Sequence, residues 1–437
     1  MVDNQTTIFE MLYPTYKINK PIRLITLFSG YDSQALALKY LGVEYEHYKT
    51  CEWAIKSIQA LKDLHFENDN TDYSKDLTTD EIKEYLLNKG ISSNYNDPMT
   101  RQQVNRLNEK QARTIYNNIK VTHNLVNIQQ VKGKDLEIVD TDKYDYIMTY
   151  SFPCQDLSLA GTRKLMNDTS TRSGMLWEVE RILDECKELG TLPSCLLMEN
   201  VTQVHGEGAK EDFNKWQLRL EELGYKNYWQ DLIATDYGIP QTRNRTFMVS
   251  ILGDYNYTFP KPIPLKLKLK DMLEDNVSEK YYLSDKQIKD IQSWNAYEKP
   301  LDNMEKIDKS NVSPTLTTRS GAYAAGMVLI KNATKQGYLE ATEGDGIDIS
   351  SRMEYHRGTV QKDKAQTLST MGGENVGVIS KDLRIRKLTP KECFRLMGVK
   401  DEDYKKVAKN QSDNSLYHLA GDSIVVNVLM AIFKELL

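Results

Sequence analysis

The sequence predicts an α/β protein with a mixed, mostly parallel sheet that carries helices on both faces, followed by a smaller β-rich domain. Three observations lead to this fold class. Short apolar runs alternate with helical patterns over residues 22–252, and the first run ends in a glycine-containing turn. The alternation then stops between about residues 253 and 382. Alternating β and α units are typical of a parallel sheet covered by helices.

The first strand is expected at residues 22–28, before a turn that contains Gly30 and a helix that Gly42 closes. A strand, a glycine-containing turn and a helix open many nucleotide-binding folds, so the domain is expected to be Rossmann-like. A second strand is expected to end near residues 51–53, and a helix to follow over residues 54–64.

A polar stretch between about residues 66 and 124 is expected to form a helical insertion on the surface. Within it, the spacing of Thr78 and Glu81 is typical of a capping box, and Gly90 is a typical helix stop. Four more strands and two more helices are then expected. The strands are at 144–152, 195–198, 228–233 and 246–252, and the helices at 173–190 and 212–224.

The loss of the strand-helix alternation after residue 252 predicts two domains: residues 1–252 with 383–437, and residues 253–382. The second range has closely spaced prolines, short β-like pieces and glycine-rich turns. Two similar stretches, at 313–323 and 365–373, are expected to form two similar strand-turn elements. Residues 420–437 predict one amphipathic helix at the C-terminus.

Composition and charge exclude several classes of protein. Hydrophobic residues make up 40% and charged residues 27%, as in ordinary globular proteins. The net charge of −5 excludes binding to polyanions by bulk charge, but not through a local basic cleft. No apolar run approaches the roughly 20 residues that span a bilayer, and residues 1–20 lack a signal-peptide core. We therefore expect a cytoplasmic protein with no membrane partner.

The five cysteines are scattered and form no C-x-x-C pair, so neither a disulfide framework nor a metal site is predicted. Cys154 stands apart from the others because it follows Pro153 where a buried strand ends. This position favours a nucleophile, against the alternative of a small buried hydrophobic residue.

Two further polar groups also lie at strand ends. Glu199 ends an apolar run, where a buried carboxylate is costly unless it is paired or used. Arg243 and Arg245 are two residues apart in an extended segment, so their side chains point to the same face. That face belongs either to a functional site or to a solvent-exposed edge.

Taken in order, these segments resemble the DNA cytosine-5 methyltransferase family. The matching stretches are LFSGYDS, the Glu-Trp pair at 52–53, SFPCQDLS, TRSGMLWEVERIL, LLMENV, DYGIPQTRNR, RKLTPKECFRLMG and AGDSIVVNVL. They follow that family's order and span nearly the whole chain. The gap from about residue 253 to 383 is where the family keeps its target-recognition domain.

The resemblance implies a reaction. A methyl group would pass from S-adenosylmethionine to carbon 5 of a cytosine in a specific duplex DNA sequence, leaving S-adenosylhomocysteine. Cys154 matches the nucleophile that attacks carbon 6, and Glu199 matches the residue at ring nitrogen 3 and the exocyclic amine. Arg243 and Arg245 match the arginines that hold Glu199 and the carbonyl oxygen of the base. The cytosine must leave the base stack to react.

The same resemblance implies a cofactor site. Its residues would be Phe28, Ser29, Gly30, Asp32, Ser33, Glu52, Trp53, Asn127, Ile128, Pro153, Asp422 and Ser423. Glu52 matches the carboxylate that accepts hydrogen bonds from the ribose hydroxyls, and Trp53 matches the aromatic side chain near the adenine. Three positions depart from the family pattern: Asp32 and Ser33 in place of a second glycine, Asn127 in place of Asp, and Asp422 in place of Asn.

For DNA, residues 155–173 resemble the family's mobile catalytic loop. The expected contacts are Gln155, Ser158, Arg163, Lys164 and Arg172, with Arg243 and Arg245 as further cations of the cleft. Base readout is expected in residues 265–379, in the loops after Leu316 and Leu368. Arg319 is the candidate for a guanine contact, against a phosphate contact or a free surface arginine.

The expected partner is double-stranded DNA. We further expect a cytoplasmic monomer that a bacterium or a phage encodes, with any cognate restriction endonuclease acting separately. Two alternatives remain at this point: an RNA-modifying relative, and a DNA-binding protein without catalytic activity.

Overall fold

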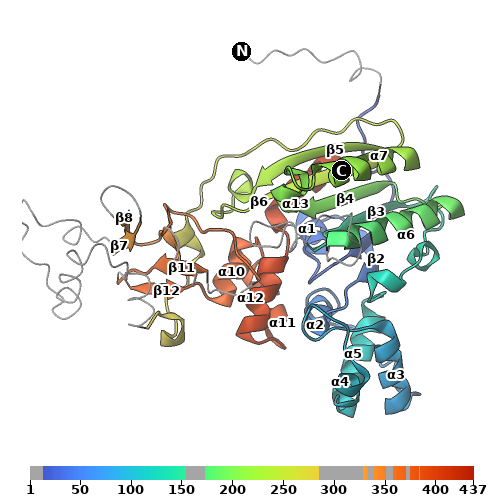
Figure 1. The fold of residues 1–437 in the computed structure, drawn as a ribbon, viewed down its shortest axis with the longest axis horizontal. Helices are drawn as coiled ribbons and strands as arrows, with labels where there is room; N and C mark the ends of the chain where they lie inside the picture. The colour runs from blue at the N-terminus through green and yellow to red at the C-terminus, as the bar shows by residue number, and fades with distance from the viewer. Residues whose placement is uncertain are drawn as a thin grey trace, which may run out of the picture.

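The computed structural model describes residues 13–153, 173–284, 328–332, 338–350, 358–370, 375–382 and 384–437. Its centre is a six-stranded sheet in the order β2-β1-β3-β4-β6-β5 (Figure 1). These strands are β1 (Ile22–Leu27), β2 (Tyr45–Cys51), β3 (Asp145–Tyr150), β4 (Cys195–Asn200), β5 (Tyr225–Ile233) and β6 (Asn244–Leu252). Strands β1 to β4 are parallel, whereas β6 runs antiparallel to both β4 and β5. The predicted mixed, mostly parallel sheet is confirmed.

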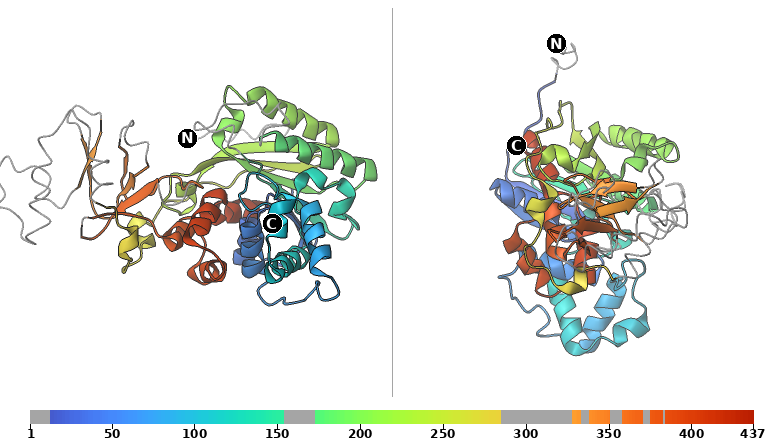
Figure 2. Two further views of the ribbon diagram at one scale, coloured as in Figure 1. Left: turned by 60° about the horizontal axis from the view of Figure 1, so that its bottom comes forward. Right: turned by 90° about the vertical axis from the view of Figure 1, so that its left-hand side faces the viewer.

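Helices cover both faces of this sheet (Figures 1 and 2). They include α1 (Ser33–Leu41), α2 (Ile55–His65), α6 (Leu176–Leu189), α7 (Lys210–Leu223), α10 (Pro390–Leu396), α11 (Asp401–Ala408), α12 (Asp413–Asp422) and α13 (Val426–Leu436). Neighbouring strand residues alternate between two cores. Leu24 packs with α1 and α13, whereas Ile25 packs with α6 and α7. This alternation follows from the two-residue period of a strand.

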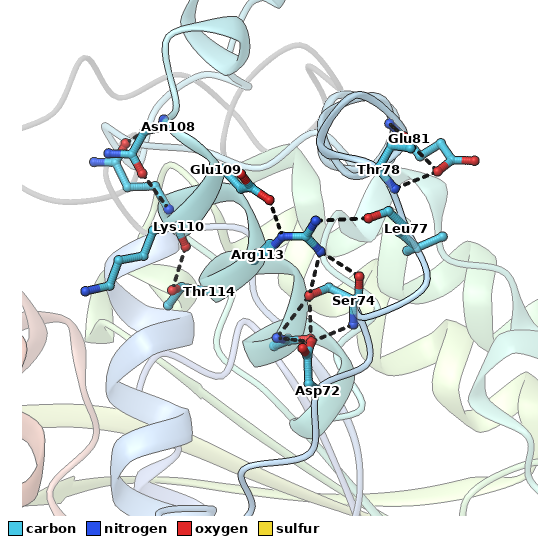
Figure 3. A network of polar contacts seen from close by, with 12 residues as sticks. Asp72, Ser74, Leu77, Thr78, Glu81, Asn108, Glu109, Lys110, Arg113 and Thr114 are labelled. Atoms are coloured by element: carbon cyan, nitrogen blue, oxygen red, sulfur yellow. Dashed lines mark hydrogen bonds and ion pairs between the residues drawn. The ribbon is translucent and has the colours of Figure 1, made fainter.

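The predicted helical insertion consists of α3 (Thr79–Lys89), α4 (Arg101–Asn105) and α5 (Glu109–Val121), and it has a small core of its own. The expected capping box of Thr78 and Glu81 is present, and Gly90 ends α3 in the left-handed conformation. Arg113 on α5 binds the loop that precedes α3 (Figure 3). Its guanidinium donates hydrogen bonds to the carbonyl oxygens of Ser74 (2.6 Å) and Leu77 (3.1 Å).

Beyond the central sheet, the structure contains a small antiparallel sheet in the order β10-β9-β11-β12, and a pair of strands, β7 and β8. Their bounds are β7 (Val328–Lys331), β8 (Tyr338–Ala341), β9 (Gly346–Asp348), β10 (Val360–Gln361), β11 (Val376–Ile379) and β12 (Ile385–Lys387). Strand β12 lies beyond the expected boundary at residue 382. Arg386 in β12 pairs with Glu392 in α10 through two hydrogen bonds of 2.8 and 2.7 Å, which joins this sheet to the helices of the C-terminal segment.

The strand-turn element expected at residues 365–373 differs from the prediction. Residues 365–370 form no named strand, and only Ala365 makes a bridge, to Gln241. The segment packs against α12 so closely that a Cβ on Gly421 would lie 2.3 Å from the backbone of Ser369. Leu368 is buried in the same core as Leu24 of β1 and Val426 of α13. Its similar stretch at 313–323 lies outside the described residues.

The single terminal helix predicted over residues 420–437 is wrong: α12 ends at Asp422 and α13 begins at Val426. Ser423 is extended, with φ −88° and ψ 170°. A residue from another part of the chain stabilises the break, because the Arg243 guanidinium donates hydrogen bonds to the carbonyl oxygens of Gly421 and Ser423. The stretch from Asp413 to Leu436 is apolar enough to cross a membrane, but 72% of its apolar window is buried inside the protein. This stretch therefore belongs to the hydrophobic core.

Candidate active site

A strained turn between β1 and α1 forms the floor of a pocket. Phe28, Gly30 and Asp32 all have positive φ angles, of 57°, 55° and 62°. Such angles are uncommon for residues other than glycine and often mark functional turns. Asp32 caps α1 by accepting a hydrogen bond from the Ala35 N–H at 3.0 Å. The turn thus directs the start of α1 toward the carboxyl edge of the sheet.

The Asp32 side chain does not line this pocket. One of its carboxylate oxygens contacts the Thr26 hydroxyl at 2.8 Å and the His47 ring at 2.7 Å. The Asp32 carboxylate is fully buried, and these contacts together with the capping bond use both of its oxygens. Burial alone would raise the pKa of Asp32, but His47 and His65 lower it below the ordinary value. The expected role of Asp32 toward a cofactor is therefore limited to shaping the turn.

The pocket lies at the carboxyl ends of β1 and β3 and is partly open to solvent. Its walls come from the β1–α1 turn, the starts of α1 and α2, the end of β3 and the end of α12. The lining residues are Phe28, Ser29, Gly30, Ser33, Gln34, Ser57, Ser151, Leu419, Asp422, Ser423 and Ile424. Six of the predicted cofactor residues are among them. Sequence analysis missed Gln34 and Ser57, whose only signal is a polar side chain on an otherwise apolar helix face.

Two observations show that this pocket fits a polar, cationic ligand. The Ser29 hydroxyl is buried and has no hydrogen-bond partner among the described residues, and open space surrounds the position of a Cβ on Gly30. In addition, the carboxylates of Glu52 and Asp422 are close enough that Asp422 raises the pKa of Glu52. A ligand with hydroxyl groups and positive charge, such as S-adenosylmethionine, would satisfy both features.

Glu52 is held beside the β1–α1 turn by backbone groups. Its carboxylate accepts hydrogen bonds from the N–H groups of Gly30 (2.9 Å) and Ala54 (2.7 Å). Burial, together with the charge of Asp422, raises the pKa of Glu52 to about 7. Trp53 packs against the core of the insertion, while Asn127 and Ile128 are buried nearby in the chain after α5.

Glu199 lies at the end of β4, next to the end of β3 in the sheet. Its carboxylate is 3.3 Å from Nε of Arg245, and only 7% of the residue is exposed. Burial raises the pKa of Glu199, Arg245 and Arg243 oppose this rise, and Asp422 adds to it. Since Asp422 acts on both Glu52 and Glu199, the pocket and the Glu199 site adjoin at the end of α12.

Arg243 and Arg245 play different parts. The described hydrogen bonds of Arg243 go to the carbonyl oxygens of Leu368 (3.1 Å), Gly421 (3.1 Å) and Ser423 (2.8 Å). Arg243 is buried, which does not suit the expected contact with DNA phosphate. It influences Glu199 by its charge and holds the turn that carries Asp422, whereas Arg245 contacts Glu199 directly.

Asn200 connects Glu199 with the segment that leads to Cys154. Its side-chain amide donates a hydrogen bond to the carbonyl oxygen of Phe152 at 2.9 Å, and its oxygen accepts one from the Val201 N–H at 2.8 Å. Pro153 is the last described residue before the gap. Asn200 was missed as a site residue, although it stands beside Glu199 in the sequence.

The predicted nucleophile and most predicted DNA contacts lie outside the described residues. These are Cys154, Gln155, Ser158, Arg163, Lys164, Arg172 and Arg319. The other four cysteines, Cys51, Cys186, Cys195 and Cys393, are free and buried. Burial raises the pKa of each, to about 11 for Cys186 and about 12 for Cys195, so none is a ready thiolate.

Comparison with known proteins identifies close relatives of the chain. A family model described as C-5 cytosine-specific DNA methylase matches residues 88–437. The chain is 34% identical over 423 residues to the Type II methyltransferase M2.ScrFI of Lactococcus lactis subsp. cremoris, covering 95% of this chain and 99% of that protein. It is 30% identical over 424 residues to the orphan methyltransferase M.SssI of Spiroplasma monobiae, covering 95% and 97%.

Solved structures with the same fold are more distant in sequence. The S. pombe Dnmt2 methyltransferase matches with a TM-score of 0.54 and 14% identity, covering 95% of this chain and 98% of that one. A Spodoptera frugiperda DNMT2 mutant matches with a TM-score of 0.55 and 15% identity, covering 95% and 99%. At these identities the likeness establishes the fold alone.

Proposed function

Because the chain belongs to the C-5 cytosine-specific DNA methylase family, we propose that it methylates cytosine in duplex DNA through a covalent adduct at Cys154. The family establishes the cytosine-5 methyltransferase activity. The observation that carries the finer mechanism is the buried Glu199 beside Arg245, one strand away from the segment that leads to Cys154.

In the proposed reaction, the Cys154 thiolate attacks carbon 6 of a cytosine that has left the base stack. Electron density then moves onto the ring and activates carbon 5. Glu199 holds a proton at ring nitrogen 3, for which its raised pKa is suited. Arg245 orients the Glu199 carboxyl. After methylation, loss of the carbon-5 proton and departure of the Cys154 sulfur restore the aromatic ring.

S-adenosylmethionine supplies the methyl group when it is bound in the pocket beside Gly30. Glu52, which binds the Gly30 N–H, would accept hydrogen bonds from the ribose hydroxyls. Asp422 and Ser423 line the pocket, and Asp422 also acts on the pKa of Glu199. Arg243 serves as a positioning residue, since it binds the carbonyl oxygens on both sides of Asp422. The substitution of Asp for the usual Asn at position 422 adds a negative charge close to a cationic ligand.

The substrate we propose is double-stranded DNA with a specific target sequence, bound by a monomer in the cytoplasm. The family description supports this substrate, because it names a DNA methylase. The relatives are Type II and orphan methyltransferases of bacteria and of Bacillus phages. Residues 253–382 are proposed as the target-recognition domain, and Arg319 as a contact to guanine. A cognate restriction endonuclease, where one exists, would act separately.

The deciding experiment compares labelled methyl transfer from S-adenosylmethionine to duplex DNA and to tRNA. Methylated DNA from cells that express the protein is then mapped by bisulfite sequencing. We expect 5-methylcytosine at one short sequence in DNA and none in tRNA. Transfer to tRNA alone would establish the RNA-modifying alternative. Specific DNA binding without transfer to either substrate would establish the inactive one.

Cofactor affinity should depend on pH through Glu52. Its pKa of about 7 means that the carboxylate form, which accepts hydrogen bonds from ribose hydroxyls, grows as pH rises from 6 to 8. We therefore expect binding of S-adenosylhomocysteine to tighten over this range, measured by calorimetry without DNA. Glu52→Gln should bind more weakly and lose the pH dependence. A wild-type affinity that is constant from pH 6 to 8 would contradict this assignment.

DNA affinity should fall steeply with salt, although the protein has a net charge of −5. Release of counterions from several phosphate contacts predicts a loss of about 10³-fold or more between roughly 50 and 200 mM salt. Arg163→Ala should reduce the slope of this dependence, measured by fluorescence anisotropy with duplex DNA. Lys110→Ala provides a matched control, because Lys110 is exposed on α5 of the insertion. A flat affinity over this range would exclude a basic DNA cleft.

A further inference from the structure

A loop of the helical insertion contacts the helix that forms one wall of the pocket. This loop, residues 91–99, connects α3 with α4. Its Tyr95 stacks on His418 of α12, with ring centroids 3.6 Å apart and planes inclined by 16°. Leu419 and Asp422, farther along α12, line the pocket. The stack therefore joins the insertion to the pocket wall.

The loop is built to hold Tyr95 in this place. Tyr95 has a φ of +64°, which is uncommon for a bulky residue and indicates stored strain. The Asn94 side chain accepts hydrogen bonds from the N–H groups of Asn96 (2.9 Å) and Asp97 (3.0 Å). The Ser92 hydroxyl donates to the carbonyl oxygen of Asp97 at 2.8 Å. These bonds keep the turn closed around the strained residue.

The start of the loop contacts residues proposed for the adenine end of the cofactor. The Ser92 N–H donates to the carbonyl oxygen of Trp53 at 2.8 Å, and the Ser92 carbonyl accepts from the Ile55 N–H at 2.9 Å. Just before the loop, a Cβ on Gly90 would lie 3.0 Å from the side-chain nitrogen of Asn127. The loop thus touches the adenine end of the proposed site and, through His418, the helix that carries Asp422.

One polar atom on each ring of the stacked pair lacks a hydrogen-bond partner among the described residues. The Tyr95 hydroxyl and Nδ1 of His418 are both buried, with no hydrogen bond of normal geometry among the described residues. The hydroxyl lies near Ser57, which lines the pocket, and near Ser415. Burial and the charges of Glu52 and Asp422 raise the pKa of Tyr95 to about 12, so the hydroxyl keeps its proton. Buried donors without acceptors are costly, and a ligand oxygen would remove this cost.

We propose that Tyr95 and His418 form a clasp over the cofactor pocket, in which Tyr95 donates a hydrogen bond to the bound cofactor and slows its release. This inference rests on the proposed function, because the ligand is S-adenosylmethionine or its product. The clasp gives the insertion a role, because it joins the loop at residues 91–99 to the helix that carries Leu419 and Asp422.

The test measures S-adenosylhomocysteine binding to the full-length protein without DNA, by calorimetry and by stopped-flow dissociation. We expect Tyr95→Ala to weaken binding by about tenfold or more, the range for loss of a buried aromatic contact, mainly through faster release. Tyr95→Phe keeps the stack but loses the hydroxyl, so its loss should be intermediate. Tyr73→Ala is the matched control, because Tyr73 is an exposed tyrosine of the same insertion, and it should bind as the wild type does.

Thermal unfolding without ligand shows whether each variant is folded, and Tyr95→Phe decides the question if Tyr95→Ala is not. Wild-type affinity and release rate in a folded Tyr95→Ala protein, or in Tyr95→Phe if only that variant folds, would overturn the clasp. Equal losses in Tyr73→Ala and Tyr95→Ala would also overturn it. A wild-type protein that binds S-adenosylhomocysteine but methylates neither DNA nor RNA would overturn the proposed function while leaving the clasp standing.

Discussion

Cys154→Ser is expected to lower the rate of methyl transfer by a factor on the order of 10⁴ or more, the loss typical of removing a covalent nucleophile. A neutral hydroxyl attacks carbon 6 far less readily than a thiolate does, and without that attack carbon 5 stays unreactive. The measurement is labelled methyl transfer to duplex DNA under single-turnover conditions. Binding of DNA and of S-adenosylhomocysteine should remain close to wild type, because the substitution replaces one sulfur by oxygen.

A DNA duplex with 5-fluorocytosine at the target position tests the adduct itself. The fluorine takes the place of the carbon-5 hydrogen, so the proton loss that releases Cys154 cannot occur after methylation. Wild-type protein should then form a complex that survives denaturation, and Cys154→Ser should form none. Cys186→Ala is the matched control, since burial raises the pKa of Cys186 to about 11 and places its thiol in the core. Normal methylation by Cys154→Ser would disprove the mechanism.

Local patterns in the sequence were sufficient to predict most of the catalytic domain. The alternation of Leu24 and Ile25 between two cores is a period-2 signal, and the capping box of Thr78 and Glu81 depends on a spacing of three residues. Both effects act between neighbours in the chain. Strands β1 and β3 and helices α1 and α2 beside the pocket were therefore predictable to within a few residues, whereas α12 was not.

Features that depend on distant residues were not predictable in this way. The break between α12 and α13 is stabilised by Arg243, which is 180 residues away from Ser423. Gly421, Asp422 and Ser423 are residue types common in turns and so give a weak local signal, but the hydrogen bonds that stabilise the break come from a distant residue. The same holds for Tyr95, whose partner His418 lies on another element far along the chain. For the same reason, the resemblance could place Arg243 in a family motif but could not show which carbonyl oxygens it binds.

Glu199→Gln is expected to slow methyl transfer by on the order of 10²-fold or more, within the range of general acid–base contributions. Gln has nearly the shape of Glu but cannot supply a titratable proton to ring nitrogen 3. The pKa of Glu199 is raised by burial. The wild-type rate should therefore decline as pH rises through that pKa, while the slower Gln variant should lack this decline. The measurement is the single-turnover rate as a function of pH.

The thermal stability of Glu199→Gln provides the control, because the substitution should lower the rate of methyl transfer without lowering the unfolding temperature. The stability that comes from a carboxyl with a raised pKa is present in full below the ordinary Glu pKa of about 4.3, and it is lost as pH rises through the native value. Glu199→Gln carries no charge, so at neutral pH it should unfold at a temperature equal to or above that of wild type. A variant that is slow and also less stable at neutral pH would indicate damage to the fold. A stable variant with the wild-type rate and pH profile would remove Glu199 from the chemistry.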